Sequence, residues 1–351
     1  RRCSQLTEIT IPPSVTEIGS SAFSGCSNLV SIRILAQIDT IEDSTFYECK
    51  KLEIIQIPDS VTSIGMFAFF KCSSLHQIEI PKSVTYIADS AFSGCSSLCT
   101  IVILGKIEII EDSTFKNCSS LTEIIIPESV GSIEKYAFSE CKSLKEILIP
   151  SSVNSVKEFA FSKCNKLTQV TLDPLTTSIN STAFDKCNSL NSLSFNTKEL
   201  STQVYDMNTF PKIIYIQFLQ NISAISSSAF NGYSSIQSIT IPESVEKIED
   251  SAFYDCSSLT DVTIPESVTF IGESAFEKCS SLSEIEVPSS ISIIQKSTFK
   301  DCSSLLKVKI PSSVKIIEEK AFWTCQQLEL IEIPNDSKLQ TIGKDAFSGS
   351  K

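Results

Sequence analysis

A fixed 23-residue period, the interval from Phe23 to Phe46, runs along the whole chain. Phenylalanine returns at this interval, and in most copies a cysteine follows three residues later. The phenylalanines in phase are Phe23, Phe46, Phe69, Phe92, Phe115, Phe138, Phe161 and Phe184, and then Phe230, Phe253, Phe276, Phe299 and Phe322. Regular Leu and Ile positions at a period of roughly 20–29 residues indicate a solenoid. About fifteen copies of one unit therefore fill residues 1–351. Phe347 comes two residues late, which predicts a two-residue insertion near Asn335–Asp336.

Each copy reads as one strand followed by one return. In the copy from Leu121 to Cys141, the segment Leu-x-x-Ile-x-Ile alternates apolar and other residues, as a half-buried strand does. Pro127 follows directly, and because proline has no N–H it ends the hydrogen-bonded ladder. The segment Ala137-Phe138-x-x-Cys141 suits a short helical turn or an irregular return on the opposite side.

A single copy is too small to fold alone, so neighbouring copies must stack. We expect one curved solenoid domain over residues 1–351, with a parallel β-sheet on its concave face. Neither end carries a polar capping repeat, and Cys3 belongs to a copy whose beginning is missing. We therefore expect a fragment of a longer protein, with any export signal or anchor outside it.

One copy departs from the pattern. In the degenerate unit 196–212, Met207 takes the position of the phenylalanine and Phe210 that of the cysteine. Tyr233 takes the cysteine position of the next copy, so Phe210 and Tyr233 should stack. Phe195 and Phe218 replace isoleucine at the last strand position.

Composition excludes several functions. The net charge of −12 opposes nucleic-acid binding. No apolar run approaches the length of a membrane-spanning helix. With His76 as the single histidine and no phosphate-binding or nucleophile motif, we predict no enzyme activity and no cofactor. Recurring carboxylate pairs such as Glu111-Asp112 are interpreted as a solvated stripe, with weak calcium binding as the alternative.

Thirteen cysteines share one position of the repeat, and only Cys99 is out of phase. Buried thiols that pack as small apolar groups are the favoured interpretation. Disulfides between neighbouring copies and a row of metal ligands are the alternatives.

Function in a solenoid lies on the outward strand positions, which form rows across the sheet. Val102, Ile125 and Leu148 are apolar at three successive copies of one such row, although outward positions are mostly polar. An exposed apolar cluster beside charges can mark an interaction site, whereas β-propensity alone would also place Val and Ile in strands. The predicted ligand-binding residues on the concave face are Thr100, Val102, Glu123, Ile125, Glu146 and Leu148.

The repeat resembles a known family. The pattern Ile-Pro-x-Ser-Val-x-x-Ile-Gly-x-x-Ala-Phe-x-x-Cys-x-x-Leu stands in Ile11–Leu29, Ile57–Leu75 and Ile264–Leu282. It is similar to the 23-residue repeat of BspA-like leucine-rich repeat proteins, of the treponemal type. The resemblance implies a leucine-rich repeat solenoid that forms a curved right-handed superhelix, with short helical or irregular turns on its convex side. It also implies a cell-surface or secreted protein that adheres to host cells or extracellular-matrix proteins, with no catalytic residues. An intracellular scaffold is the main alternative, and an enzyme built on a solenoid is a remote one.

Overall fold

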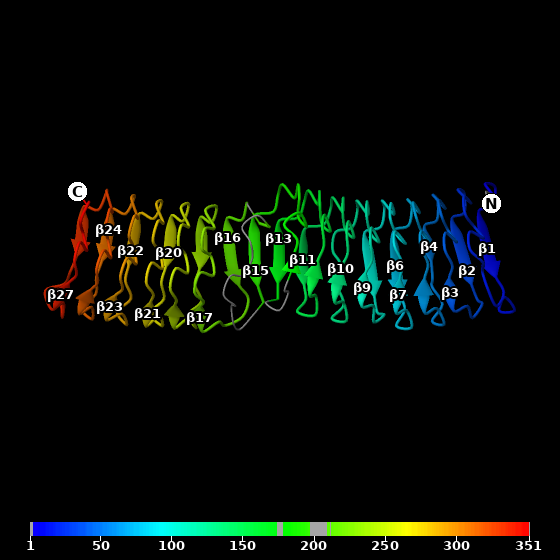
Figure 1. The fold of residues 1–351 in the computed structure, drawn as a ribbon. Helices are drawn as coiled ribbons and strands as arrows, with labels where there is room; N and C mark the ends of the chain where they lie inside the picture. Colours follow the sequence, from blue (N-terminus) through cyan, green and yellow to red (C-terminus); the bar gives the residue numbers. More distant parts are fainter. Residues whose placement is uncertain (1–2, 174–177, 197–208, 211, 351) are drawn as a thin grey trace. The chain divides into compact units, whose positions relative to one another are not determined.

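The computed structural model describes residues 3–173, 178–196, 209–210 and 212–350. These residues form two compact units, unit 1 (Arg1–Leu190) and unit 2 (Asn191–Lys351), each of which is described by itself. In both units the chain winds in coils whose strands pair in parallel with those of the neighbouring coil (Figure 1). The predicted leucine-rich-repeat solenoid architecture is thus confirmed, while its continuity as one domain over 1–351 stays a prediction.

The predicted strands form what we call the first ladder. In unit 1 its strands are β1 (Glu8–Ile11), β2 (Ser31–Ile34), β4 (Ile54–Ile55), β6 (Gln77–Ile80), β8 (Thr100–Ile103), β11 (Glu146–Ile149) and β13 (Gln169–Leu172). In unit 2 they are β15 (Ser192–Phe195), β16 (Tyr215–Phe218), β18 (Ser238–Thr240), β20 (Asp261–Thr263), β22 (Glu284–Glu286), β24 (Lys307–Lys309) and β26 (Leu330–Glu332). The remaining expected strand, around Ile124, is not formed, and β8 and β11 belong to different sheets.

A second ladder of two-residue strands was not predicted. In unit 1 it comprises β3 (Thr40–Ile41), β5 (Ser63–Ile64), β7 (Tyr86–Ile87), β9 (Ile109–Ile110), β10 (Ser132–Ile133), β12 (Ser155–Val156) and β14 (Ser178–Ile179). In unit 2 it comprises β17 (Ala224–Ile225), β19 (Lys247–Ile248), β21 (Phe270–Ile271), β23 (Ile293–Ile294), β25 (Ile316–Ile317) and β27 (Thr341–Ile342). Such a short run of alternating pattern cannot be recognised as a strand in a sequence.

The register follows the sequence period. Glu8 pairs with Ser31 and Ser238 pairs with Asp261, so each residue pairs with its equivalent in the next copy of the repeat. Between β25 and β27 the shift grows by two, because Ile316 pairs with Thr341. Lys309 still pairs with Glu332 at the ordinary shift, so the extra residues lie between Glu332 and Thr341. The insertion predicted near Asn335–Asp336 is confirmed.

Proline limits the first ladder as expected. Strands β6 and β11 end at the residue before Pro81 and Pro150. Where leucine replaces proline, one more bond forms between coils: the N–H of Leu104 donates to the carbonyl of Ile80 at 2.9 Å. Proline has no N–H, so the coils that carry Pro81 and Pro150 cannot form this additional bond.

The return segment is not helical in any described coil, so the helical alternative was wrong. Every second N–H points to the next coil: those of Ser90, Phe92 and Gly94 donate to carbonyls of that coil at 2.7–3.0 Å. The N–H groups between them donate to carbonyls of the preceding turn within the same coil. This alternation needs left-handed backbone at two positions of the return, φ 56° at Ser90 and φ 80° at Gly94. A helix would direct all these N–H groups along its own axis and leave the next coil's carbonyls unpaired.

The phenylalanines form a continuous stack inside each unit. Ring centroids of successive coils lie 5.1–5.7 Å apart in unit 1, from Phe23 to Phe184, with interplanar angles of 4–19°. In unit 2 the stack from Phe230 to Phe347 has spacings of 5.2–5.6 Å. The period of the sequence is thus the period of a buried aromatic column.

The in-phase cysteines are free thiols beside this column. From Cys49 to Cys187, and again from Cys256 to Cys325, each Sγ lies 3.0–3.3 Å from the carbonyl oxygen of the phenylalanine in the preceding coil. The S–H is a weak donor, and here it satisfies an oxygen that is buried. Burial raises the pKa of the Cys95 thiol to about 12, which keeps it protonated and unreactive. The buried-thiol interpretation agrees with this arrangement.

The degenerate unit is described only in part. Residues 197–208 and 211, with Met207, lie outside the described residues. Phe195 and Phe218 stack at 5.9 Å, and both rings also approach Phe230, at 6.1 and 6.2 Å. Phe210 and Tyr233 are both buried, and their mutual stacking stays a prediction.

We expect Phe138→Ala to lower the free energy of unfolding by about 3–5 kcal/mol, because it empties a fully buried position in the column. The matched control is Phe159→Ala, which removes a half-buried ring that stacks on Tyr136 outside the column. It should cost less than about 1.5 kcal/mol. Urea unfolding followed by circular dichroism measures both, and equal losses would contradict a column that dominates stability.

We expect Thr324→Gly to stabilise the protein. Thr324 holds φ 59°, a conformation that costs a β-branched residue about 1–2 kcal/mol. Glycine removes this cost but loses about 0.5–1 kcal/mol to the greater entropy of its unfolded chain. The net gain of up to about 1.5 kcal/mol should raise the urea midpoint. The reverse exchange, Gly94→Ala at φ 80°, should lower it, and the idea fails if both variants shift the same way.

Reaction with a thiol reagent should distinguish the cysteine positions. In the native protein only Cys3, which is exposed, and Cys99, which is half-buried, should react within minutes. The other twelve thiols are buried and should react only after unfolding, for a total of 14. A total below 14 in unreduced, denatured protein would show that some thiols are paired as disulfides.

Candidate functional site

Outward side chains of the first ladder form two rows. Strands β6 and β11 alternate exposed and buried residues, so the first and third residues of each strand point to solvent. Row 1 contains the first of these residues in each coil, such as Gln77 and Glu146, and row 2 the third, such as Glu79 and Leu148. Because the buried residues of each strand belong to the core, only these rows can differ between coils without disturbing it.

All six predicted ligand-binding residues lie exposed on this face of unit 1. Thr100 and Val102 stand on β8, and Glu146 and Leu148 stand on β11. Glu123 and Ile125 belong to the coil between them, which forms no strand at this position. The structure thus brings the six residues together, and their role in binding stays a prediction.

We call Val102, Ile125 and Leu148 the apolar row. Val102 and Leu148 keep 42% and 44% of their surface in contact with solvent, and Ile125 keeps 85%. Ile125 is the most exposed of the large apolar side chains in the described residues, and its coil forms no strand of the first ladder. Apolar side chains that remain exposed to water do not stabilise the folded chain. Their clustering here is therefore consistent with a surface that contacts another molecule.

Carboxylates accompany the apolar row. Between Ile54 and Thr171, the charged members of rows 1 and 2 are Glu79, Glu123 and Glu146, with no lysine or arginine. Among the described residues these three glutamates form no ion pair within 4.0 Å. This face therefore combines the apolar row with three glutamates that have no ion-pair partner in the described residues.

A groove continues this face toward the N-terminus of unit 1. It has a volume of about 360 Å³, and Thr100 and Val102 form part of its wall. Its other outward-pointing residues are Ile54, Gln56, Asp59, Gln77 and Glu79. The sequence placed Ile54 in row 1 but gave no sign of the groove, because its depth depends on how far neighbouring side chains project.

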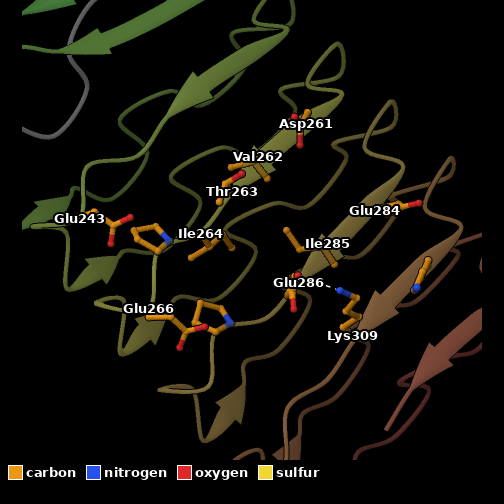
Figure 2. Close-up of a pocket in the computed structure, with 13 residues that line it drawn as sticks. Glu243, Asp261, Val262, Thr263, Ile264, Glu266, Glu284, Ile285, Glu286 and Lys309 are labelled. Carbon is orange, nitrogen blue, oxygen red and sulfur yellow. Dashed lines mark hydrogen bonds and ion pairs between the residues drawn. The ribbon is translucent and has the colours of Figure 1, made fainter.

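Unit 2 carries a second groove on the same kind of face, with a volume of about 420 Å³ (Figure 2). Figure 2 shows Asp261 and Thr263 on one strand, Glu284 and Glu286 on the next, and Lys309 on the third. Sequence reasoning did not single out these residues. Charged side chains at successive rungs of rows 1 and 2 were the available signal.

The charges of this second groove are partly matched within the chain. Lys309 Nζ lies 3.2 Å from a carboxylate oxygen of Glu286, the contact marked by the dashed line in Figure 2. Lys307 pairs with Glu332 at 2.9 Å, and Glu266 accepts hydrogen bonds from the N–H and hydroxyl of Ser289. Glu266, Glu286 and both lysines thus already have partners, unlike the glutamates beside the apolar row.

The predicted carboxylate stripe proves to be more than a solvated surface. Asp43 and Asp250 each accept the backbone N–H of a residue in the next coil, at 2.7 and 2.8 Å. A Cβ on Gly65 would lie 2.5 Å from Asp43 Oδ1, and one on Gly272 would clash with Asp250 Oδ1. The glycine of one coil therefore makes room for the aspartate of the previous coil.

The same stripe concentrates negative charge in unit 1. Burial, and then the charge of Asp112, raise the pKa of Asp89. Burial, and then the charges of Asp89 and Glu134, raise the pKa of Glu111. No group of three or more His, Cys, Asp or Glu in the described part of the chain has a geometry that could hold a metal ion. The carboxylates therefore show no calcium-binding arrangement in that part of the chain.

The described residues also contain no helix of the length and apolarity that a membrane crossing requires. The outward face of the first ladder is an extended surface that carries an apolar row, hydrogen-bonding side chains and charges. Such a surface is suited to binding.

Comparison with known proteins places the repeat in a family. The model of the "BspA type Leucine rich repeat region (6 copies)" matches residues 1–122, 108–236 and 223–351. A search among curated proteins found no match.

Solved structures with similar chains include two bacterial proteins. A leucine-rich repeat protein from Bacteroides ovatus has 29% sequence identity, with 99% of this chain and 77% of that chain covered and a TM-score of 0.48. A leucine rich cell surface protein from Faecalibacterium prausnitzii has 31% identity, with 93% and 87% covered and a TM-score of 0.41. Because the family model matches every part of the sequence, this chain belongs to the BspA-type leucine-rich repeat proteins.

Proposed function

We propose that this chain is a non-enzymatic, cell-surface or secreted protein that binds other proteins, and that it serves adhesion to host cells or extracellular matrix. Family membership supports protein binding, since leucine-rich repeat solenoids present extended faces to protein partners. The cell-surface location and the adhesive role rest on what the family resemblance implies.

The observation that carries the proposal is the apolar row. Val102, Ile125 and Leu148 stand exposed at three successive coils, with Thr100, Glu123 and Glu146 beside them. An interface core of this kind, surrounded by polar side chains, is the usual anatomy of a protein-binding site. We therefore assign binding to these six residues and to the adjoining groove.

An intracellular scaffold is the second candidate, and the thiols favour it. All 14 cysteines are free in the structure, whereas secreted proteins usually pair their cysteines. Twelve of the cysteines are buried beside the phenylalanine column. Burial alone would also keep them as free thiols, even in a secreted protein. Surface labelling of intact source cells with an antibody separates the two candidates, because only a surface protein is reached without permeabilisation.

Replacing the apolar row should abolish adhesion. The triple variant V102S/I125S/L148S should bind a panel of purified extracellular-matrix proteins at least about 10-fold more weakly than the wild type, because partly buried apolar contacts are lost. The control Q217S/T240S changes two successive exposed positions of row 2 in unit 2, outside both grooves, and should bind as the wild type does. Surface plasmon resonance measures both. Unchanged affinity of the folded triple variant for every matrix protein that the wild type binds would refute the assignment.

A further inference from the structure

The length of the apolar row limits what can lie along it. Neighbouring strands of a sheet are about 4.7–4.9 Å apart, so Val102, Ile125 and Leu148 span about 9–10 Å across the coils. Residues i, i+4 and i+7 of an α-helix span about 10.5 Å on one side of the helix. Three same-side residues of an extended strand span about 13 Å. The row therefore matches one side of a helix better than it matches an extended peptide.

The charges beside the row indicate the sign of the partner. Glu123 and Glu146 flank it in row 1, and Glu79 stands one rung before Val102 in row 2. Lys82 and Lys145 occupy other positions of their coils and are not in these rows. None of the three glutamates has an ion-pair partner within the described residues, so each is available to a cation from outside.

The adjoining groove has the same character. Ile54, exposed over 55% of its surface, and Val102 are its apolar outward residues, and Asp59 and Glu79 are its charges. A partner that follows the apolar row toward the N-terminus thus continues to meet apolar contact with negative charge beside it. The groove of unit 2 differs, because its lysines already pair with carboxylates there.

We propose that the apolar row and the adjoining groove of unit 1 bind an amphipathic helix of a partner protein, with apolar residues at i, i+4 and i+7 and lysine or arginine beside them. This inference rests on the proposed protein-binding function and specifies the partner. The apolar side chains supply the contact, and complementary charge selects the partner and its orientation.

Selection from a phage-displayed library of random peptides, long enough for three to four helical turns, tests the proposal. The folded wild-type protein should enrich peptides with net positive charge and apolar residues at the helical spacing. V102S/I125S/L148S should not enrich them. For one selected peptide, E123Q/E146Q should weaken binding by about 2- to 10-fold in fluorescence anisotropy and should reduce its salt dependence. The control Q217S/T240S should behave as the wild type does.

Three results would overturn the inference: enriched peptides that are neutral or acidic, apolar residues at the alternate spacing of a strand, or binding that E123Q/E146Q leaves unchanged. The double variant changes only exposed side chains, so it remains informative if the triple variant folds poorly. If matrix proteins lose affinity for the triple variant while the peptides show no basic preference, the proposed function stands and the inference about the partner fails.

Discussion

Hydrogen bonds between successive coils are the constraint on which the rest of the structure depends. A single coil has little interior of its own, and most of its inward-facing backbone groups find partners only in the coil before or after it. In the strands this requires parallel pairing at a constant shift. In the returns it requires every second N–H to point forward, which fixes left-handed backbone at residues such as Ser90 and Gly94.

The buried side chains follow from that shift. Because equivalent residues of successive coils lie directly above one another, a phenylalanine in one coil must stack on a phenylalanine in the next, and a thiol meets the same carbonyl each time. The small size of cysteine and its weak donor suit a position beside a buried carbonyl oxygen. The two-residue insertion between Glu332 and Thr341 is tolerated because the strand before it and the strand after it both pair with the preceding coil.

The residue types that vary most freely between coils are those of the outward rows, and in these rows the two units differ. Unit 1 presents an apolar row with unpaired glutamates, whereas the charged groove of unit 2 is partly neutralised by Lys307 and Lys309. A protein bound at the first surface would displace water, whereas one bound at the second would also compete with ion pairs within the chain. The same scaffold therefore carries surfaces that differ in polarity and in the pairing of their charges.

The sequence by itself determined the period, the parallel register, the positions of the phenylalanine column and the two-residue insertion, because each depends on residues repeated at equal spacing. It also identified Val102, Ile125 and Leu148 as an apolar row. Only the tertiary structure decided the non-helical return, the second ladder and the absence of a first-ladder strand around Ile125. These depend on which backbone groups meet in neighbouring coils, and the shape of the two grooves depends on how far neighbouring side chains project, neither of which is encoded in a local pattern.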